Sequence, residues 1–332
     1  MAILVTGGAG YIGSHAVLGL KRLNKEVVVA DNLETGHKES LLKDVPFYNG
    51  NLKDAAFLDR IFIEHEIKAV IHFAANSLVG ESMENPLKYF DNNVGGTLSL
   101  IEAMNRHGVK KIVFSSTAAA YGEPETVPIR ETDQTLPTNP YGESKLMVEK
   151  VLKWADQAYG IKYAVLRYFN VAGADREGIV GEDHRPETHL IPIILQVALG
   201  KRDEIKIFGD DYPTEDGTCI RDYIHVTDLV EAHLLALEHL DTHDSNTFNL
   251  GNGSGFSVKE VIDAAREVTG HAIPASVEKR RAGDPAVLIA SSDKAKEVLG
   301  WAPVYTDMKK IIQTAWDWFE KHPDGYREGG ES

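Results

Sequence analysis

Residues 2–15 read AILVTGGAGYIGSH, a short apolar run followed by glycines at positions 7, 10 and 13. The apolar run predicts a buried strand, and the glycines predict a sharp turn from that strand into a helix. Glycine meets three needs of such a turn, namely unusual torsions, close approach of the backbone to a pyrophosphate, and close packing of the helix. The N–H groups and the dipole at the helix start then attract the anion. Gly7, Gly10 and Gly13 therefore predict a dinucleotide-binding turn.

The second predicted strand, residues 27–30, is followed by Asp31, which lies 18 residues beyond Gly13. A carboxylate at this place accepts hydrogen bonds from a ribose diol and repels an additional 2′-phosphate. This arrangement favours NAD over NADP as the cofactor. The alternative is that Asp31 only caps a turn.

The same pattern continues through the first 170 residues, where short apolar runs alternate with amphipathic segments. Strands are predicted at 2–6, 27–30, 45–48, 69–73, 111–114 and 163–167. Continuous apolar strands that alternate with helices are typical of a parallel sheet covered on both faces. Because crossovers between parallel strands are right-handed, the predicted fold class is α/β, with a doubly wound, Rossmann-like sheet.

The second half of the chain is less regular and richer in loops. Helices are predicted at 190–199, 227–240, 258–268 and 306–319. We predict an NAD-binding domain at 1–170 and a smaller, mixed α/β domain for the substrate at 171–332. A segment near 222–250 is expected to return to the first domain.

Composition limits the partners and the compartment. The 332 residues include 35 Lys and Arg and 50 Asp and Glu, so the formal net charge is −15. This charge argues against nucleic acid or an anionic membrane surface as the partner, because both favour a basic face. Cys219 is the only cysteine, which excludes an intrachain disulfide and favours a reducing compartment. Since no apolar run approaches the roughly 20 residues that span a bilayer and no leader peptide is recognisable, we expect a cytoplasmic protein.

Tyr141 and Lys145 are candidate catalytic residues. They lie four residues apart, hence on one face of a helix, and Asn139-Pro140 directly before them is a typical helix start. The spacing alone carries no weight, because about 1.3 Tyr-x-x-x-Lys/Arg matches are expected by chance. The chain has two further matches, at 163–167 and 305–309.

The surroundings of Tyr141 distinguish it from the other two tyrosines. Its helix follows the predicted strand that leads to Thr117, in the half of the chain that carries the glycine-rich turn. A neighbouring ammonium, the positive nicotinamide ring and the helix N-terminus would each lower the pKa of the phenol and make it a usable base. Lys145 would also hold the nicotinamide ribose, and Thr117 would donate or relay a hydrogen bond to the reacting hydroxyl. The alternative is an ordinary helix start after an ordinary strand.

Recognisable motifs extend over essentially the whole chain. They are TGGAGYIGSH (6–15), DNL (31–33), HFAA (72–75), DNNVGGTL (91–98), FSST (114–117), AYG (120–122), NPYGESK (139–145), RYFNVAGA (167–174), YPTEDGTCIRDYIHVTDL (212–229), FNLGNGSGFSV (248–258), RRAGDPA (280–286) and LGW (299–301). With the Gly-x-x-Gly-x-x-Gly spacing, they resemble the UDP-glucose 4-epimerase (UDP-galactose 4-epimerase) family, in the extended branch of the short-chain dehydrogenase/reductase superfamily.

The resemblance implies roles for individual residues. For NAD it implies contacts with the glycine-rich turn and with Tyr11, Ile12, Asp31, Asn32, Thr35, Gly36, Asn51, Leu52, Phe73, Ala74, Ala75, Ser77, Asn92, Tyr141, Lys145 and Phe169. For a UDP-sugar it implies contacts with Thr117, Tyr141, Asn170, His189, Ile205, Ile207, Phe208, Arg221, Arg281 and Asp284. Two guanidinium groups suit a diphosphate because each offers a planar fork of donors. The family also implies a homodimer formed by the helices near 85–107 and 141–158.

The activity implied by the resemblance is reversible 4-epimerisation of UDP-glucose and UDP-galactose with tightly held NAD, through a transient 4-keto sugar. Tyr141 would remove the proton of the 4-hydroxyl. One alternative is a 4-epimerase or decarboxylase of another UDP-sugar, such as a UDP-uronate. Another is a non-catalytic NAD-responsive binding protein, against which the intact set of Thr117, Tyr141 and Lys145 argues.

Three positions depart from the family pattern. Thr117 stands where the family often has Ser, and because Ala118-Ala119 follow it, the acid and base groups of related dehydratases are missing and dehydration is disfavoured. His189 stands where many relatives have Asn. Leu288 lies near a position that is often a bulky Tyr, so room for UDP-N-acetylglucosamine and UDP-N-acetylgalactosamine is a hypothesis.

Glu182, Asp183, His184, Glu187 and His189 form a run of potential metal ligands. Their spacing, in a loop that contains Pro186, is not that of a typical metal motif. We interpret the run as a solvated loop or a substrate lid, and we expect no metal in the chemistry described above.

Overall fold

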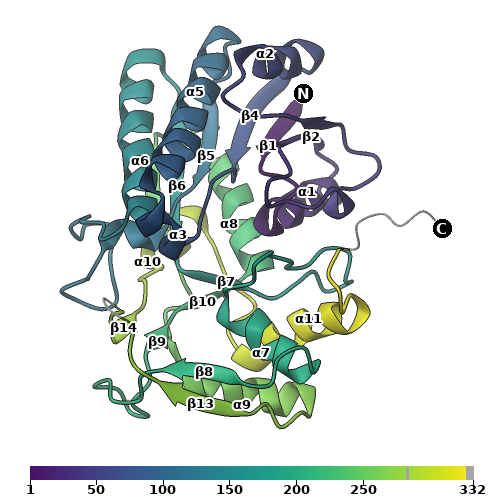
Figure 1. Cartoon of the computed structure of the whole chain (residues 1–332). Coiled ribbons are helices and arrows are strands. Elements are labelled where there is room, and N and C mark those ends of the chain that lie inside the picture. The colour runs from purple at the N-terminus through teal and green to yellow at the C-terminus, as the bar shows by residue number, and fades with distance from the viewer. Residues whose placement is uncertain (282–283, 327–332) are drawn as a thin grey trace.

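The computed structural model describes residues 1–281 and 284–326. Within these residues, seven parallel strands form one sheet in the order β11-β6-β5-β4-β1-β2-β3 (Figure 1). The strands are β1 (Ala2–Thr6), β2 (Glu26–Asp31), β3 (Phe47–Asn49), β4 (Ile67–His72), β5 (Lys111–Ser115), β6 (Lys162–Tyr168) and β11 (Asn246–Leu250). The strand order reverses between β1 and β4. Ligands of doubly wound sheets bind at such a reversal, outside the carboxyl ends of the strands.

A hydrophobic core lies on each face of the sheet. In β1, Ile3 and Val5 belong to one core and Ala2 and Leu4 to the other, because successive side chains of a strand face opposite ways. The first core is covered by α1 (Tyr11–Arg22), α8 (Val226–His239) and α10 (Asp293–Leu299). The second is covered by α2 (Ala55–Glu64), α5 (Gly96–Arg106) and α6 (Pro140–Tyr159).

A second layer, at the bottom of Figure 1, has a core of its own. This core contains Ile194 of α7 (Leu190–Ala198), Val261 of α9 (Val258–Thr269) and Trp318 of α11 (Met308–Lys321). Small sheets complete the layer: β8 (Ile205–Phe208) with β13 (Ala275–Glu278), β7 (Asn170–Ala172) with β10 (Tyr223–His225), and β9 (Ile220–Arg221) between β12 (Phe256–Ser257) and β14 (Val287–Leu288).

Short helical segments follow several strands of the main sheet. They are η1 (Lys38–Ser40), α3 (Val79–Glu84), α4 (Pro86–Tyr89), the π-helical turn η2 (Phe90–Gly95) and η3 (Ala118–Tyr121). Because η2 leads directly into α5, residues 86–106 form a nearly continuous helical stretch beside α6.

The predicted doubly wound α/β fold is confirmed, and each end of the six predicted strands lies within two residues of the observed end. β11 lies next to β6 at the edge of the main sheet, so the chain returns to the sheet after building part of the second layer. The domain limits 1–170 and 171–332 remain a prediction, and residues 327–332 lie outside the described part of the chain.

Two observations bear on the expectations drawn from composition. Cys219 is a buried free thiol. Across residues 1–281 and 284–326, we find no helix with both the length and the apolar character needed to cross a membrane.

Candidate active site

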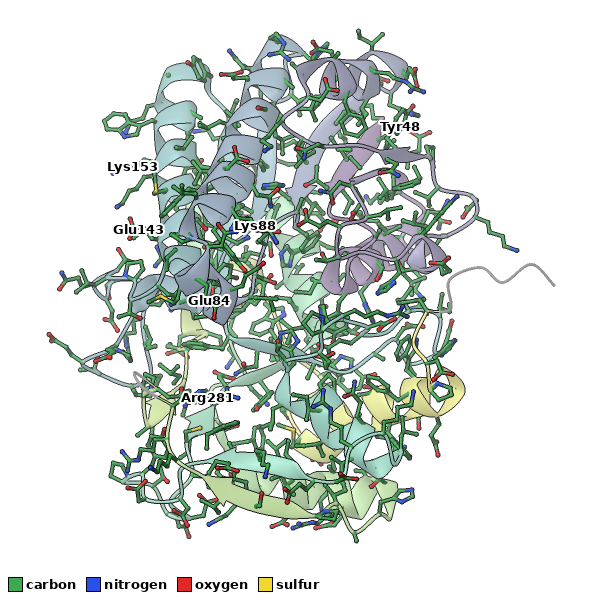
Figure 2. The ribbon with its side chains drawn as sticks, viewed as in Figure 1. Tyr48, Glu84, Lys88, Glu143, Lys153 and Arg281 are labelled. Atoms are coloured by element: carbon green, nitrogen blue, oxygen red, sulfur yellow. The ribbon has the colours of Figure 1, made fainter. Side chains whose placement is uncertain are left out.

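A cavity of about 1030 Å³ opens at the carboxyl edge of the main sheet. Its walls come from segments that follow β1, β2, β4, β5 and β6, together with the loop before α7 and the segment around Arg281, which Figure 2 shows in the region between the two layers. Predicted site residues that line it are Gly7, Gly10, Tyr11, Ile12, Gly13, Asp31, Asn32, Thr35, Asn51, Leu52, Phe73, Ala74, Ala75, Ser77, Asn92, Thr117, Tyr141, Lys145, Phe169, Asn170, His189, Arg281 and Asp284. The structure therefore brings together residues that are distant in the sequence.

The glycines of the turn let its backbone pack closely against neighbouring backbone. Gly7 has φ +73°, and a Cβ there would lie 2.6 Å from the backbone nitrogen of Ala74. A Cβ on Gly13 would lie 2.0 Å from the carbonyl oxygen of Gly7. No side chain caps the N-terminus of α1, which begins after Gly10, so its first N–H groups can bind an anion.

Asp31 ends β2 beside this turn and faces the cavity. Its two carboxylate oxygens accept hydrogen bonds from the backbone N–H groups of Ala9, at 3.0 Å, and Leu33, at 2.8 Å. Burial raises the pKa of Asp31, and these hydrogen bonds lower it. Each oxygen keeps a free lone pair, so the carboxylate can still accept from a ribose diol. The glycine-rich turn and Asp31 fit a dinucleotide.

Tyr141 and Lys145 lie on α6, whose first turn is capped by Asn139. The side chain of Asn139 accepts a hydrogen bond from the N–H of Gly142 at 2.8 Å, and Pro140 occupies the first turn. The Lys145 ammonium donates to the carbonyl oxygen of Ser115 at 2.8 Å. Both side chains line the cavity, since residues four apart share one helix face.

The pKa of Tyr141 differs from the expectation. Burial raises the pKa of Tyr141 above 10.0, and a hydrogen bond with the Thr117 hydroxyl opposes that rise. Burial also lowers the pKa of Lys145 from 10.5 to about 7. The protein alone therefore does not lower the pKa of the phenol, because desolvation disfavours both charged groups.

A buried polar network lies behind Lys145, and it was not predicted from the sequence. Glu149 lies one helical turn after Lys145, accepts from the Ser116 hydroxyl at 2.6 Å and forms an ion pair with Arg167. Arg167 also donates to the Tyr121 hydroxyl at 2.8 Å. The network ties β5, α6 and β6 together. The i, i+4 spacing of Glu149 from Lys145 could have indicated that both side chains lie on the same face of the helix.

The predicted substrate residues divide into two groups. Arg281 and Asp284 line the cavity, the Arg281 guanidinium lies 4.0 Å from the centre of the Phe208 ring, and Arg221 pairs with Asp284. Ile205 and Ile207 instead point into the core of the second layer, because alternate residues of β8 face opposite ways. A ligand therefore cannot meet their side chains.

Gly36 also lies outside the cavity lining, packed against Ala9. A Cβ on Gly36 would lie 2.9 Å from the Ala9 carbonyl carbon. Its role is to let the chain approach the glycine-rich turn closely. Residues 282 and 283 of the RRAGDPA motif lie outside the described residues.

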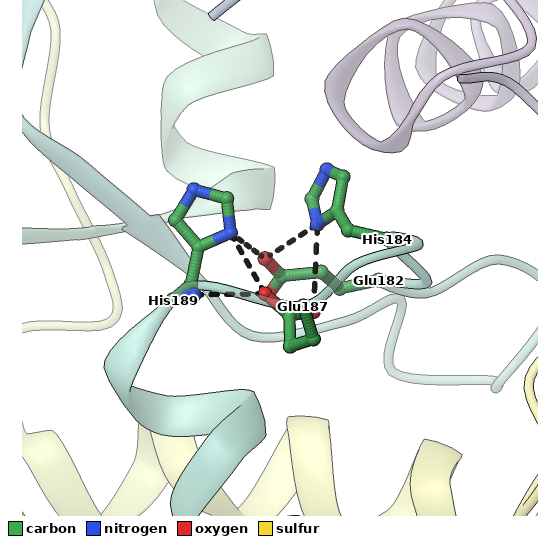
Figure 3. Close-up of side chains that lie close together, drawn as sticks. All are labelled: Glu182, His184, Glu187 and His189. Carbon is green, nitrogen blue, oxygen red and sulfur yellow. Dashed lines mark hydrogen bonds and ion pairs between the residues drawn. The ribbon is translucent and has the colours of Figure 1, made fainter. Parts of the chain in front are cut away.

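The loop before α7 is only partly solvated, since Arg185, Pro186 and Thr188 are exposed whereas Glu182 is buried. The carboxylates of Glu182 and Glu187 and the imidazoles of His184 and His189 face a common point (Figure 3). Burial lowers the pKa of both histidines, but the adjacent carboxylates of Glu182 and Glu187 raise it more, to about 9 for His184 and about 10 for His189. A backbone path that brings these four side chains together cannot be seen in their sequence spacing.

Comparisons with known proteins agree with this geometry. A family model described as "NAD dependent epimerase/dehydratase family" matches residues 3–251. The UDP-glucose 4-epimerase of Halalkalibacterium halodurans is 61% identical over 327 residues, covering 98% of each chain. Two solved UDP-glucose 4-epimerases superpose on this chain with a TM-score of 0.93.

The first of these structures, from Brucella ovis in complex with NAD, is 47% identical and covers 96% of this chain and 98% of its own. The second, from Bifidobacterium longum in complex with NAD+ and UDP, is 40% identical and covers 98% of this chain and 100% of its own. The match of the family model extends over well more than half of the sequence. The chain therefore belongs to the NAD dependent epimerase/dehydratase family.

Proposed function

We propose that this protein interconverts UDP-glucose and UDP-galactose by reversible epimerisation at C4, with NAD as a tightly held cofactor. The observation that carries the proposal is the convergence of Thr117, Tyr141 and Lys145 in the cavity that also contains the glycine-rich turn. The relatives named UDP-glucose 4-epimerase support it, at up to 61% identity.

The N-terminus of α1 would hold the cofactor pyrophosphate and Asp31 the adenine ribose, because one offers N–H donors and the other a carboxylate. Lys145 would hold the ribose next to the nicotinamide. Held in this way, NAD would supply a reversible hydride acceptor beside C4 of the sugar. The other cofactor residues named from the family are proposed contacts in the same cavity, whereas Gly36 acts through the packing of the turn.

Tyr141 would accept the proton of the 4-hydroxyl, and Thr117 would orient that hydroxyl through the hydrogen bond it shares with Tyr141. Burial raises the pKa of the phenol in the ligand-free protein, so the phenolate needs neighbouring positive charge in the complex. A protonated Lys145 supplies part of it, since an adjacent cation favours the charged form of an acid.

The UDP end would lie against Arg281 and Asn170, with Arg221 aligning Asp284. Anchoring UDP while leaving the hexose free allows the keto sugar to present its other face. Leu288 also lines the cavity, and we propose that it leaves room for the N-acetyl group of the corresponding UDP-N-acetylhexosamines.

Incubation with UDP-galactose, without added cofactor, tests the proposal. We expect UDP-glucose as the product, and we expect Tyr141→Phe to lower kcat by about 10²–10⁴-fold while NAD content is retained, because loss of a positioned general base costs this much. Tyr305→Phe is the matched control, since Tyr305 has the same spacing to a lysine but stacks on His225. Near-normal turnover by Tyr141→Phe would exclude Tyr141 as the base. Absence of turnover despite binding of NAD and UDP-sugar would favour a binding protein.

We also propose a homodimer, in the cytoplasm, formed by the faces of α4, α5 and α6. Leu87 and Trp154 are 76% and 67% exposed there, and Leu98 and Met147 are exposed as well. Large apolar side chains gathered on neighbouring helices are typical of an interface. Light scattering should give twice the chain mass, and Trp154→Lys should shift it to the monomer. A monomeric wild type would refute the dimer.

A further inference from the structure

The side chains of Glu182, His184, Glu187 and His189 have the geometry of a metal site. The His184 Nδ1 atom lies 3.2 Å from an oxygen of Glu182 and 3.5 Å from an oxygen of Glu187. The His189 Nδ1 atom lies 3.1 Å from an oxygen of each carboxylate. Zinc bonds of about 2.0–2.2 Å in a tetrahedron separate neighbouring ligand atoms by about 3.3–3.6 Å. The four contacts, of 3.1–3.5 Å, are close to this separation, and one ligand atom from each of the four residues lies within 4.8 Å of every other.

A buried atom without a hydrogen bond points into this cluster. Glu182 is only 4% exposed, and neither its Oε1 atom nor the buried Nδ1 atom of His184 has a hydrogen-bond partner. The His189 Nδ1 atom, in contrast, is hydrogen-bonded to an oxygen of Glu187 at 3.1 Å. A buried carboxylate oxygen without a donor can be satisfied by a cation.

Charge balance and access both allow an ion to enter. An imidazole that binds a metal through its nitrogen gives up its proton, so the metal-bound cluster has two neutral imidazoles and two carboxylates, and one divalent cation neutralises their charge of −2. Glu182, His184 and His189 line the cavity, and the His189 side chain is 44% exposed, so an ion can reach the cluster from the cavity.

We propose that Glu182, His184, Glu187 and His189 bind one divalent transition-metal ion of the zinc class. Two imidazoles among four ligands favour Zn²⁺ or Co²⁺ over Mg²⁺ and Ca²⁺, which prefer oxygen ligands. The ion lies in the wall of the cavity, beside the ring of Tyr11, whose centre is 6.1 Å from that of His184. The inference concerns metal binding alone and stands whether or not the proposed epimerase activity is found.

Addition of CoCl₂ to the full-length protein after dialysis against a chelator tests the proposal. We expect one equivalent of Co²⁺ per chain with the intense visible absorption of tetrahedral Co²⁺, displaced by Zn²⁺ but not by Mg²⁺. His184→Gln and Glu187→Gln should each weaken Co²⁺ binding by at least about 10- to 100-fold, a loss that removal of an outer-shell partner alone can cause.

The matched control is His243→Gln. His239 and His243 stack with ring centres 4.2 Å apart at the end of α8, and this close histidine pair could bind metal adventitiously. Unchanged binding in this variant supports the cluster. The proposal is overturned if His243→Gln removes the signal, if both cluster variants bind Co²⁺ like the wild type, or if the bound Co²⁺ has an octahedral spectrum. Melting curves show whether each variant is folded. If one of the two cluster variants does not fold, the other one alone tests the proposal.

Discussion

Two glycines of the same turn should respond differently to replacement by alanine. A Cβ on Gly13 would lie 2.0 Å from the Gly7 carbonyl oxygen and 2.8 Å from the Gly8 Cα, whereas real Cβ atoms keep at least 3.0 Å. The backbone of the turn or of α1 must therefore move by about 1 Å, and such overpacking costs about 1–3 kcal/mol. We expect Gly13→Ala to lower the melting temperature by several degrees and to reduce the bound NAD.

Gly10→Ala is the contrasting variant. Gly10 has φ −80° and ψ 173°, a conformation open to any residue, and a Cβ there would approach the protein no closer than 3.4 Å, at the Gly7 oxygen. Gly10 lines the cavity, so the added methyl group projects where a pyrophosphate would approach. We expect the stability of the ligand-free protein to change by less than about 0.5 kcal/mol, with a loss of NAD.

Melting curves of the ligand-free proteins and the NAD released by denaturation measure both effects. The wild type is the reference for both measurements. Gly108→Ala measures the cost of backbone strain alone, because Gly108 has φ +73° and open space around it and lies outside the cavity. A backbone clash at Gly13 is excluded if Gly13→Ala melts and binds NAD like the wild type, or if Gly10→Ala destabilises the protein as much as Gly13→Ala.

Three further predictions concern charged groups. Burial lowers the pKa of Lys145 to about 7, so the unfolded chain binds more protons than the folded protein between pH 7 and 10.5, and the free energy of unfolding should rise with pH there. In urea titrations without NAD, Lys145→Met should make this rise less steep. An unchanged dependence on pH would contradict the lowered pKa. Arg167→Met should lower the free energy of unfolding by about 3–5 kcal/mol, because it leaves Glu149 as an unpaired buried charge; a loss below about 1 kcal/mol in denaturant titration would show that the pair is not closely coupled. Arg281→Met should weaken UDP binding at least about tenfold in calorimetry, since a guanidinium bound to a diphosphate contributes about 1.5–3 kcal/mol. Arg280 pairs with Asp211 instead, so the Arg280→Met variant should bind UDP normally.

Local features were predictable from the sequence. The strand, the glycine-rich turn and the start of α1 follow one another within fourteen residues, and each depends on torsions and side-chain alternation of neighbouring residues. The start of α6 was equally clear, because Asn139 and Pro140 act within one helical turn. Asp31 could be placed beside the turn because β1 and β2 are adjacent parallel strands.

Features that depend on distant contacts could not be predicted. The alternation of Ile205, Lys206 and Ile207 indicates that the two isoleucines share one buried face. It does not show that Phe208 meets Arg281, because that contact joins β8 to a segment distant in the sequence. The pKa of Lys145 depends on desolvation by elements from many parts of the chain.

The loop at 182–189 shows the difference most clearly. Residue types alone suggested possible ligands there, and the spacing argued against a site. Convergence of the four side chains comes from packing of the loop against the cavity wall and the start of α7, where His189 precedes the first helical residue. Sequence periodicity reports which face of a helix or strand is apolar, whereas an irregular loop has no period, so only its tertiary contacts set where its side chains point.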